Sequence, residues 1–243
     1  MTRGTLLDHW YPETEDGVRF RDGTMPFYSW LKESTPDPGR SRVLNLGAGP
    51  GTEPARAIRG FFGEVVGLDV DPAVLENPDV DQAFVYDGLR FPFEDETYDV
   101  CVSDWTMEHI ERPTTVLAEI FRVLKSGGLL TFRTPNKYHY VTIGARIIPD
   151  RFHIVANRMR LLEGPASLPH ETYYRLNSRG LISSELGKQG FVEVEARMVE
   201  SYPSYLLFNR RLFALGTLYE RFVNASPTLA WLRHTILIKA RKP

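Results

Sequence analysis

Short apolar runs alternate with amphipathic stretches along much of this 243-residue chain. Runs typical of buried strands occupy 42–46, 64–69, 82–87, 98–103 and 129–134. Between the last two, residues 113–125 place Val116, Ile120, Val123 and Leu124 on one helical face, and Ser126 to Gly128 are expected to end that helix. Strands alternating with helices predict an α/β domain with a parallel sheet covered on both faces.

Proline, glycine and capping residues divide the rest of the chain. We expect an N-terminal segment over 1–41, with a short helix in 25–33, and a main domain over 42–243. Thr52 can cap a helix through about Gly60, and Asp71 followed by Pro72 suits the start of another. The alternation is interrupted at about 136–177 and 201–233, whereas 178–190 reads as a helix and 191–199 and 235–242 as strands.

Composition narrows the class of protein. With 29 basic and 31 acidic side chains the formal charge is −2, which argues against a nucleic-acid partner. Cys101 is the single cysteine, so neither an intrachain disulfide nor a cysteine-based zinc cluster can form. The first residues lack the apolar core of a signal peptide, and no run approaches the ~18 apolar residues of a spanning helix. A cytoplasmic location is therefore expected.

Three consecutive strands end in groups that suit a nucleotide-like ligand. The first runs into Gly47, Gly49 and Gly51, which let the backbone approach a ligand and leave a helix N-terminus open. Asp69 ends the second strand, where a carboxylate can accept from ribose hydroxyls, whereas Asp71 suits a helix cap better. Asp87 ends the third strand. Open α/β sheets bind ligands along this edge, although each feature alone also fits an ordinary turn.

Together with the stretch from Tyr86 to Asn136, which includes EIFRVLKSGG and TPN, these residues resemble the class I S-adenosylmethionine-dependent methyltransferases, most closely the group with ubiquinone-pathway and small-molecule O-methyltransferases. The resemblance covers roughly 40–136. It implies a Rossmann-like, doubly wound sheet of seven strands, mostly parallel with an antiparallel last strand, and an inserted substrate cap. A nicotinamide dehydrogenase fits less well, because Thr52 occupies the sixth position of the loop, where its fingerprint needs glycine.

The resemblance also implies S-adenosyl-L-methionine as cofactor and assigns residues to it. Its methionine part would meet the glycine turn, its ribose the second strand end, and its adenine the third, while the residues after the fourth strand line the methyl-transfer site. The full set is Gly47, Ala48, Gly49, Gly51, Asp69, Val70, Asp87, Gly88, Leu89, Ser103, Asp104 and Trp105. Asn45 and Ala48 depart from the family, which usually has Asp and often Cys or Ser there.

A hydroxyl acceptor benefits from a general base, and a histidine suits that role. His109 lies just past the fourth strand, although we favour a structural role for it at the start of the next helix. His139 is a second candidate base, from the first insertion. No His/Asp/Glu set has metal-ligand spacing, so we expect no catalytic metal.

The acceptor should be recognised by the insertion at 136–177. Its aromatic rings and hydrogen-bonding groups suit a small or glycan-like acceptor, and its arginines suit an anionic group on it. The candidates are Tyr138, His139, Arg151, His153, His170, Tyr173, Tyr174 and Arg175, each of which could equally pack as an ordinary lid residue. We therefore expect O-methylation; alternatives are methyl transfer to nitrogen, carbon or a carboxylate of a small or lipid-linked acceptor, and a non-catalytic protein that kept the fold.

Residues 204–223 are apolar with three arginines. Two interpretations stay open: a helix at a membrane surface or homodimer contact, and a helix packed on its own domain. We favour the second, because only three basic residues accompany the apolar positions.

Overall fold

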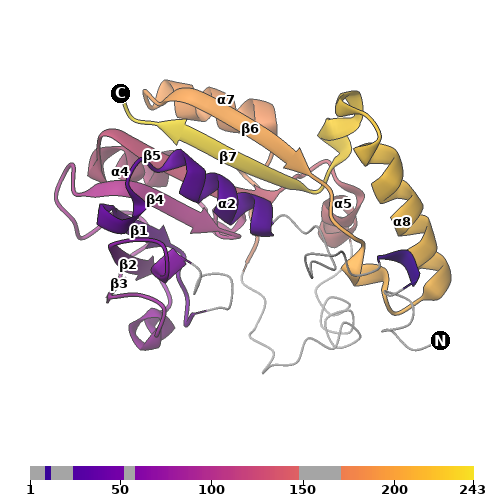
Figure 1. The fold of residues 1–243 in the computed structure, drawn as a ribbon, viewed down its shortest axis with the longest axis horizontal. Coiled ribbons are helices and arrows are strands. Elements are labelled where there is room, and N and C mark those ends of the chain that lie inside the picture. Colours follow the sequence, from indigo (N-terminus) through magenta and orange to yellow (C-terminus); the bar gives the residue numbers. More distant parts are fainter. Residues whose placement is uncertain (1–8, 12–23, 52–57, 148–170) are drawn as a thin grey trace. The chain divides into compact units, whose positions relative to one another are not determined.

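The computed structural model describes residues 9–11, 24–51, 58–147 and 171–243. Within these ranges the helices and strands follow one another as α2 (Thr24–Ser34), η1 (Pro38–Arg40), β1 (Arg42–Leu46), β2 (Glu64–Asp69), η2 (Pro72–Glu76), β3 (Gln82–Val85), β4 (Tyr98–Asp104), η3 (Met107–His109), α4 (Pro113–Val123), β5 (Leu124–Pro135), α5 (Tyr140–Ile147), α7 (Arg179–Lys188), β6 (Val192–Val199), η4 (Ser204–Leu206), α8 (Arg210–Asn224), η5 (Pro227–Leu232) and β7 (Thr235–Arg241) (Figure 1).

The strands form one seven-stranded sheet in the order β3-β2-β1-β4-β5-β7-β6, mostly parallel with an antiparallel last strand. The predicted fold class is confirmed. Strand order reverses between β1 and β4, which pair in parallel with Leu46 opposite Ser103. Such a switch point opens a crevice at the carboxyl ends of the neighbouring strands. The first three strand ends predicted to carry ligand groups therefore lie next to one another.

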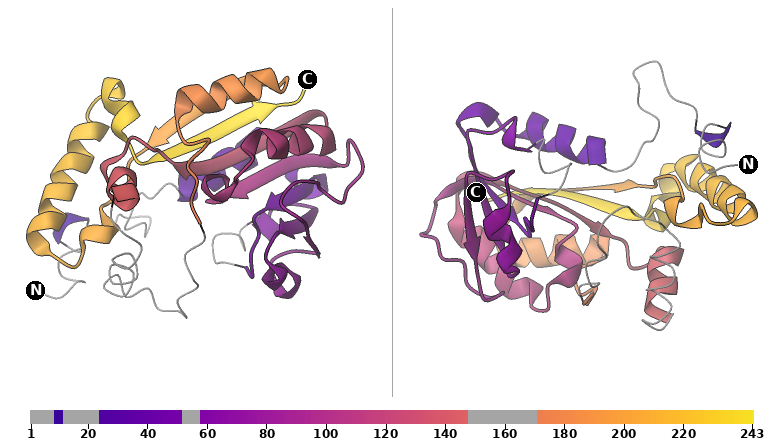
Figure 2. Two further views of the ribbon diagram at one scale, coloured as in Figure 1. Left: turned by 180° about the vertical axis from the view of Figure 1, so that it is seen from behind. Right: turned by 90° about the horizontal axis from the view of Figure 1, so that it is seen from below.

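Helices cover both faces of this sheet. Figure 2 shows α2 on one face and α4 and α7 on the other. Central strands are accordingly apolar on both sides: Val43, Leu44, Val100 and Val102 are all at most 1% exposed. A parallel sheet buried on both faces needs such continuous apolar runs, which is why the runs were readable in the sequence.

The chain divides into two compact units. One comprises 1–25, 136–169 and 198–235, and the other comprises 26–135, 170–197 and 236–243. The larger unit holds most of the sheet. The smaller one gathers most of the N-terminal segment with most of both predicted insertions, so three segments far apart in sequence share contacts.

Several predicted boundaries differ from the structure. The helix expected over 113–125 ends at Val123, and β5 begins at Leu124, which pairs with Tyr98 before the glycines are reached. Gly127 instead donates its N–H to the Lys242 carbonyl at 3.0 Å. The hydrogen bonds that this segment forms with β4 and with the end of the chain therefore decide its structure, although its local pattern predicted a helix. The third strand ends at Val85, two residues earlier than expected.

Two of the predicted helices are confirmed, and a third lies mainly outside the described residues. The short helix predicted in 25–33 is α2. Asp71 caps η2, since its side chain accepts the N–H of Ala73 at 2.9 Å, although this helix is a 3-10 helix. The helix expected from Thr52 falls mainly in 52–57, outside the described residues.

Candidate functional site

The turn after β1 is built from glycines in left-handed conformations. Gly47, Gly49 and Gly51 have φ values of 77°, 52° and 96°. At Gly47 a Cβ atom would lie 2.0 Å from Thr106 Oγ1, so the close approach of Thr106 requires glycine there. The Asn77 amide donates to the carbonyls of Ala48 and Gly49, both at 3.0 Å. The turn is therefore fixed from two neighbouring loops.

Asp69 lies at the end of β2 and binds this turn directly. One carboxylate oxygen accepts the Gly49 N–H at 2.8 Å, and the other accepts the Asp71 N–H at 2.9 Å. Each oxygen of an ionised carboxylate has about two acceptor positions, so both retain capacity for a ligand hydroxyl. Asp71 caps the helix as predicted, and Asp69 lies at the turn, where its role toward a ribose stays a prediction.

Asp87 lies in the turn after β3. Its carboxylate accepts the N–H groups of Leu89 and Arg90 at 2.8 and 2.9 Å. These backbone hydrogen bonds, that from Arg90 first, hold the pKa of Asp87 below its usual value. Gly88 has a φ of 83°, which allows the turn to close. An ionised acceptor is thus held at the third strand end.

The three strand ends line one cavity of about 330 Å³, a size that suits a small ligand. It includes Gly47, Asp69, Val70, Asp87, Gly88 and Leu89 among the predicted residues. It also includes Tyr86, Thr106, Ile110, Glu111 and Arg112, which the sequence reasoning did not select, together with His109 and Tyr173. Tyr86 and Thr106 lie within two residues of a strand end, so extending each strand end slightly would have found them. The other three follow η3, and the strand pattern gave no signal for them.

Other predicted donor residues lie beside this cavity and do not line it. Ser103 is 0% exposed and Ala48 only 6%. Asp104 forms an ion pair with the buried Arg133 guanidinium, and it accepts the Tyr28 hydroxyl at 2.7 Å. The cavity thus lacks Ser103 and Asp104, which were expected at the methyl-transfer site, and Ala48, which was expected at the methionine part of the donor. Their roles toward the donor stay predictions.

Arg133 forms the ion pair that holds the Asp104 side chain, and the sequence reasoning missed it. It is 3% exposed and its guanidinium carbon lies 5.1 Å from the centre of the Trp105 ring. Trp105 has a φ of 55°, a left-handed conformation uncommon for a large side chain. The apolar run LLTFRT predicted a buried strand but gave no signal that its arginine would be buried with a partner.

The loop after β4 is joined to the segment 171–175. The Glu108 carbonyl accepts the N–H groups of Tyr173 and Tyr174 at 2.9 and 3.2 Å. His109 Nδ1 lies 2.8 Å from the Glu171 carbonyl, and Arg175 donates to the Glu111 carbonyl at 2.8 Å. Because a carbonyl only accepts, Nδ1 carries the proton that is donated to Glu171. The fastening role we favoured for His109 fits this contact, while its role as a base stays a prediction.

Glu108 lies beneath this loop and is 5% exposed. Its carboxylate accepts the Thr134 hydroxyl at 3.0 Å, and Thr134 in turn accepts from the Asn177 amide at 2.7 Å. Burial raises the pKa of Glu108 to about 7. A carboxyl group that titrates near neutrality therefore lies within the loop that lines the cavity.

The remaining predicted acceptor residues belong to the smaller unit or lie outside the described residues. Tyr138 is 53% exposed. His139 is 0% exposed and its Nε2 lies 3.3 Å from Glu200 Oε1. Burial lowers the pKa of His139 to about 4 and raises that of Glu200 to about 8, so both are neutral near pH 7. No acceptor can reach His139 without movement around it, and Arg151, His153 and His170 fall in the undescribed range 148–170.

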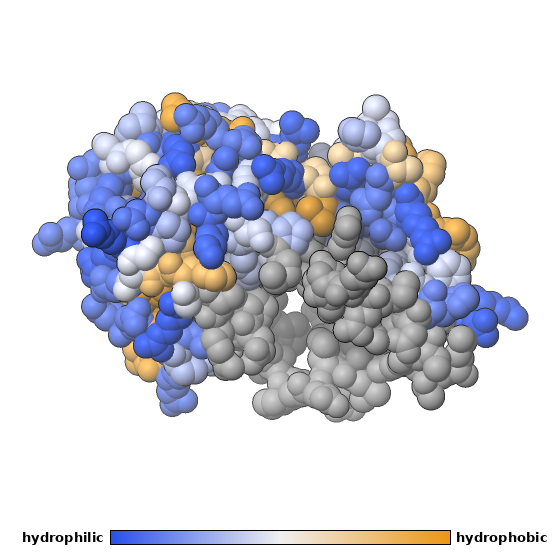
Figure 3. Space-filling model, in the orientation of Figure 1, coloured by the Kyte–Doolittle hydropathy of each residue, from blue (hydrophilic) through white to orange (hydrophobic). Residues whose placement is uncertain are grey.

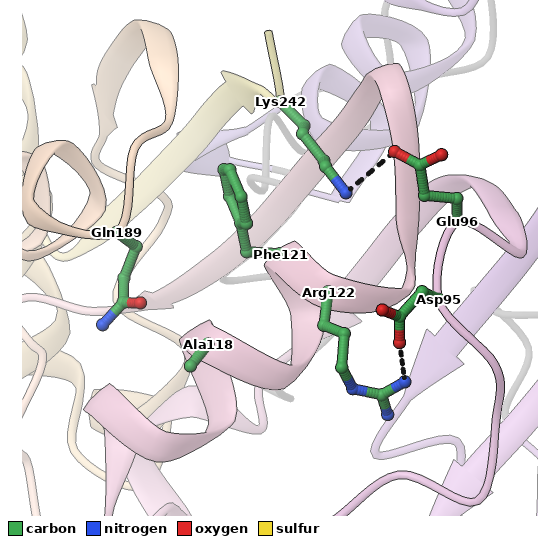
Figure 4. Close-up of a pocket in the computed structure, with 7 residues that line it drawn as sticks. All are labelled: Asp95, Glu96, Ala118, Phe121, Arg122, Gln189 and Lys242. Atoms are coloured by element: carbon green, nitrogen blue, oxygen red, sulfur yellow. Dashed lines mark hydrogen bonds and ion pairs between the residues drawn. The ribbon is translucent and has the colours of Figure 1, made fainter.

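A larger cavity of about 560 Å³ lies elsewhere on the larger unit (Figure 4). Its charged side chains pair with one another: Arg122 with Asp95 at 2.8 Å, and Lys242 with Glu96 at 3.4 Å. None of the groups predicted for donor or acceptor binding lines it. The smaller cavity at the strand ends is therefore the candidate site.

Two absences hold for the part of the chain that the structure describes. No three His, Cys, Asp or Glu side chains gather there in a way that could hold a metal ion. None of the helices described there is long and apolar enough to cross a membrane.

Comparisons with known proteins show what this chain is similar to. Residues 44–132 match the family described as "Methyltransferase domain". An uncharacterized methyltransferase of Mycobacterium sp. (strain JLS) is 34% identical over 135 residues, 51% of this chain and 53% of that protein. This chain thus matches about half the length of that relative. The malonyl-[acyl-carrier protein] O-methyltransferase of Methylococcus capsulatus is 27% identical over 213 residues, 82% of this chain and 70% of that protein.

Among solved structures, the phosphoethanolamine N-methyltransferase 2 of Haemonchus contortus, in complex with S-adenosyl-L-methionine, aligns with a TM-score of 0.58. It is 20% identical and covers 90% of this chain and 52% of that chain. At this identity the likeness shows the fold alone.

Proposed function

We propose that this chain, whose residues 44–132 form a class I S-adenosylmethionine-dependent methyltransferase domain, transfers a methyl group from S-adenosylmethionine to a hydroxyl of a small or glycan-like acceptor. One observation carries the donor part: the Asp69 carboxylate is held by two backbone N–H groups at the rim of the cavity, with acceptor capacity left over. That this chain belongs to the ubiquinone-pathway-like group of these methyltransferases is also part of the proposal.

The residues that line the cavity fit the parts of this donor. The remaining acceptor positions of Asp69 suit the two ribose hydroxyls. Val70, Leu89 and Ile110 supply apolar surface for a flat base, and Asp87 supplies an acceptor for an exocyclic amine. The turn is open at Gly49, where nothing lies within 4 Å of a Cβ position, and this space suits the amino-acid part of the donor. Polar acceptors and apolar walls thus occur in the order that an adenosine needs.

S-adenosylmethionine supplies a methyl group on a sulfonium, and the departing group is a neutral thioether. The chain must therefore align the acceptor and exclude water, and orientation can contribute up to roughly 7–11 kcal/mol. The loop with His109 and the segment with Tyr173, joined by their backbone hydrogen bonds, both line the cavity. They are suited to border the acceptor next to the donor.

A hydroxyl acceptor loses its proton when it is methylated, so a nearby base would help. His109 lines the cavity, and because its Nδ1 donates to a carbonyl, Nε2 is the nitrogen that would take such a proton. The names of two relatives place the methyl group on oxygen and on nitrogen, respectively. The choice of oxygen therefore rests on the acceptor residues and not on those relatives.

Two measurements test the proposal in sequence. Calorimetry should show micromolar binding of S-adenosylmethionine and of its demethylated product, weakened in Asp69→Ala; no binding of either would contradict donor use. Labelled methyl transfer to hydroxyl, amine and carboxyl acceptors should then yield a product stable to mild base. A base-labile product would indicate a methyl ester, and an N-methylated product would exclude the hydroxyl. Binding without any turnover would favour a non-catalytic protein.

A further inference from the structure

Helix α8 is apolar on two opposite sides. One side packs within the smaller unit through Phe213, Gly216, Thr217 and Val223, which are all buried. These residues recur at intervals of three, one and six positions, as one face of a helix does. The interpretation that we favoured, a helix packed on its own domain, thus describes one side of α8.

The opposite side is exposed although it is apolar. Leu212, Leu215, Leu218 and Phe222 are 40%, 62%, 56% and 60% exposed. They recur every three or four residues and form what we call the outer stripe of α8. Phe208, just before the helix, is 51% exposed as well. Figure 3 shows hydrophobic residues at the outer edge of α8, beside hydrophilic ones. Single exposed apolar residues are ordinary, but a contiguous row marks an interaction surface.

Charges at the end of this stripe are basic. Arg210 and Arg211 are exposed, and neither has an acidic partner among the described residues. Arg211 lies four positions before Leu215 and therefore on the same face. The one acid of α8, Glu220, is held by Tyr11 at 3.1 Å and by Asn224 at 2.8 Å. The stripe itself thus combines apolar side chains with positive charge only.

We propose that the outer stripe of α8 binds the surface of a membrane with anionic lipids. An interfacial helix buries an apolar face at the boundary of headgroups and acyl chains, while its basic residues meet lipid phosphates. A second copy fits this face less well. A two-fold contact would bring together two identical stripes without an acid, so the arginines would lose water without gaining an opposite charge.

Cosedimentation of the full chain with vesicles tests this proposal. We expect binding to vesicles that contain phosphatidylglycerol and much weaker binding to pure phosphatidylcholine, because each basic residue near an anionic surface contributes roughly fivefold to partitioning. Leu215→Ser combined with Leu218→Ser and Phe222→Ser should lower partitioning at least roughly tenfold. Arg210→Glu with Arg211→Glu should lower it at least roughly 25-fold and weaken its dependence on salt.

Two control variants change other exposed positions. Arg40→Glu with Lys188→Glu alters the net charge equally at side chains that are 90% and 66% exposed. Val85→Ser with Val192→Ser removes apolar groups that are 40% and 44% exposed. Both controls should bind vesicles as the unmodified chain does, and all variants should keep its thermal midpoint and donor affinity.

Three results would overturn the proposal: no binding of the unmodified chain to anionic vesicles, equal binding by the stripe variant, or a dimer in solution that the stripe variant converts to a monomer. The last result would assign the stripe to a second copy. None of these results depends on donor binding, so failure here leaves the proposed methyl transfer untouched.

Discussion

The Asp69 carboxylate accepts the backbone N–H of Gly49 at 2.8 Å, across a separation of twenty residues in the chain. This hydrogen bond joins the end of β2 to the turn after β1. It holds the carboxylate where its remaining acceptor positions face the cavity, and it fixes the turn at the same time. A change at Asp69 should therefore affect both ligand binding and the turn.

Asp69→Ala should weaken the binding of S-adenosylmethionine by about 10- to 100-fold, because hydrogen bonds to a charged group contribute about 1.5–3 kcal/mol. Asp69→Asn should also weaken it, since an amide NH₂ would face one of the two N–H groups that the carboxylate accepts. Titration calorimetry measures both. Asp71→Asn is the matched control, because its side chain can still cap η2. Unchanged affinity in Asp69→Ala would remove the ribose role.

Gly47→Ala should destabilise the fold far more than Gly49→Ala. Both glycines have positive φ, so both variants carry the cost of a left-handed alanine, about 1–2 kcal/mol. Only at Gly47 does the new Cβ meet the Thr106 side chain; at Gly49 nothing lies within 4 Å of it. Urea unfolding should show a larger loss of unfolding free energy in Gly47→Ala than in Gly49→Ala. Equal losses would mean that Thr106 moves aside freely.

Arg133→Met should lower the free energy of unfolding by about 3–5 kcal/mol, because it leaves the partly buried Asp104 carboxylate without its ion pair. The Asp104 side chain is 18% exposed and that of Arg133 only 4%. Combining Arg133→Met with Asp104→Asn should recover part of the loss. Denaturant unfolding of the two single variants and the double variant measures their coupling. Simple additivity of the two losses would show that the pair is not a unit.

Glu108→Gln should change how stability depends on pH. Burial raises the pKa of Glu108 from 4.5 to about 7, so between these values the folded chain holds a proton that the unfolded chain has released. Stability therefore falls as pH rises through this window, by up to about 3 kcal/mol from this group. The fall should be smaller in Glu108→Gln, which mimics the protonated acid. Parallel pH profiles of the unmodified chain and the variant would contradict this account.

His109→Gln separates a base from a fastening residue. If Nε2 takes the acceptor's proton, turnover at saturating acceptor should fall by about 10²–10⁴-fold with little change in donor affinity. If the ring only fastens the segment 171–175, thermal stability and acceptor KM should change while turnover persists. Steady-state kinetics together with calorimetry distinguish the two, and His9→Gln, at an exposed histidine that does not line the cavity, serves as a control.

Much of this protein could be predicted from sequence because its determinants are local. Continuous apolar runs such as 42–46 predicted strands buried on both faces, and the glycines and acids directly after them predicted a ligand-binding edge. The helix cap at Asp71 depends on neighbouring residues alone, since its side chain accepts the N–H of Ala73. The order of donor groups along three adjacent strand ends followed from the same pattern.

Tertiary structure decided what depends on partners distant in the chain. Nothing local in LLTFRT indicates that Arg133 pairs with Asp104, nor that Glu108 is buried beneath Thr134. Leu124 became a strand residue because Tyr98 pairs with it, against the local helix pattern. Burial, pKa and pairing are properties of the assembled environment, so the sequence determined which groups are available and the folded chain determined which of them face a ligand.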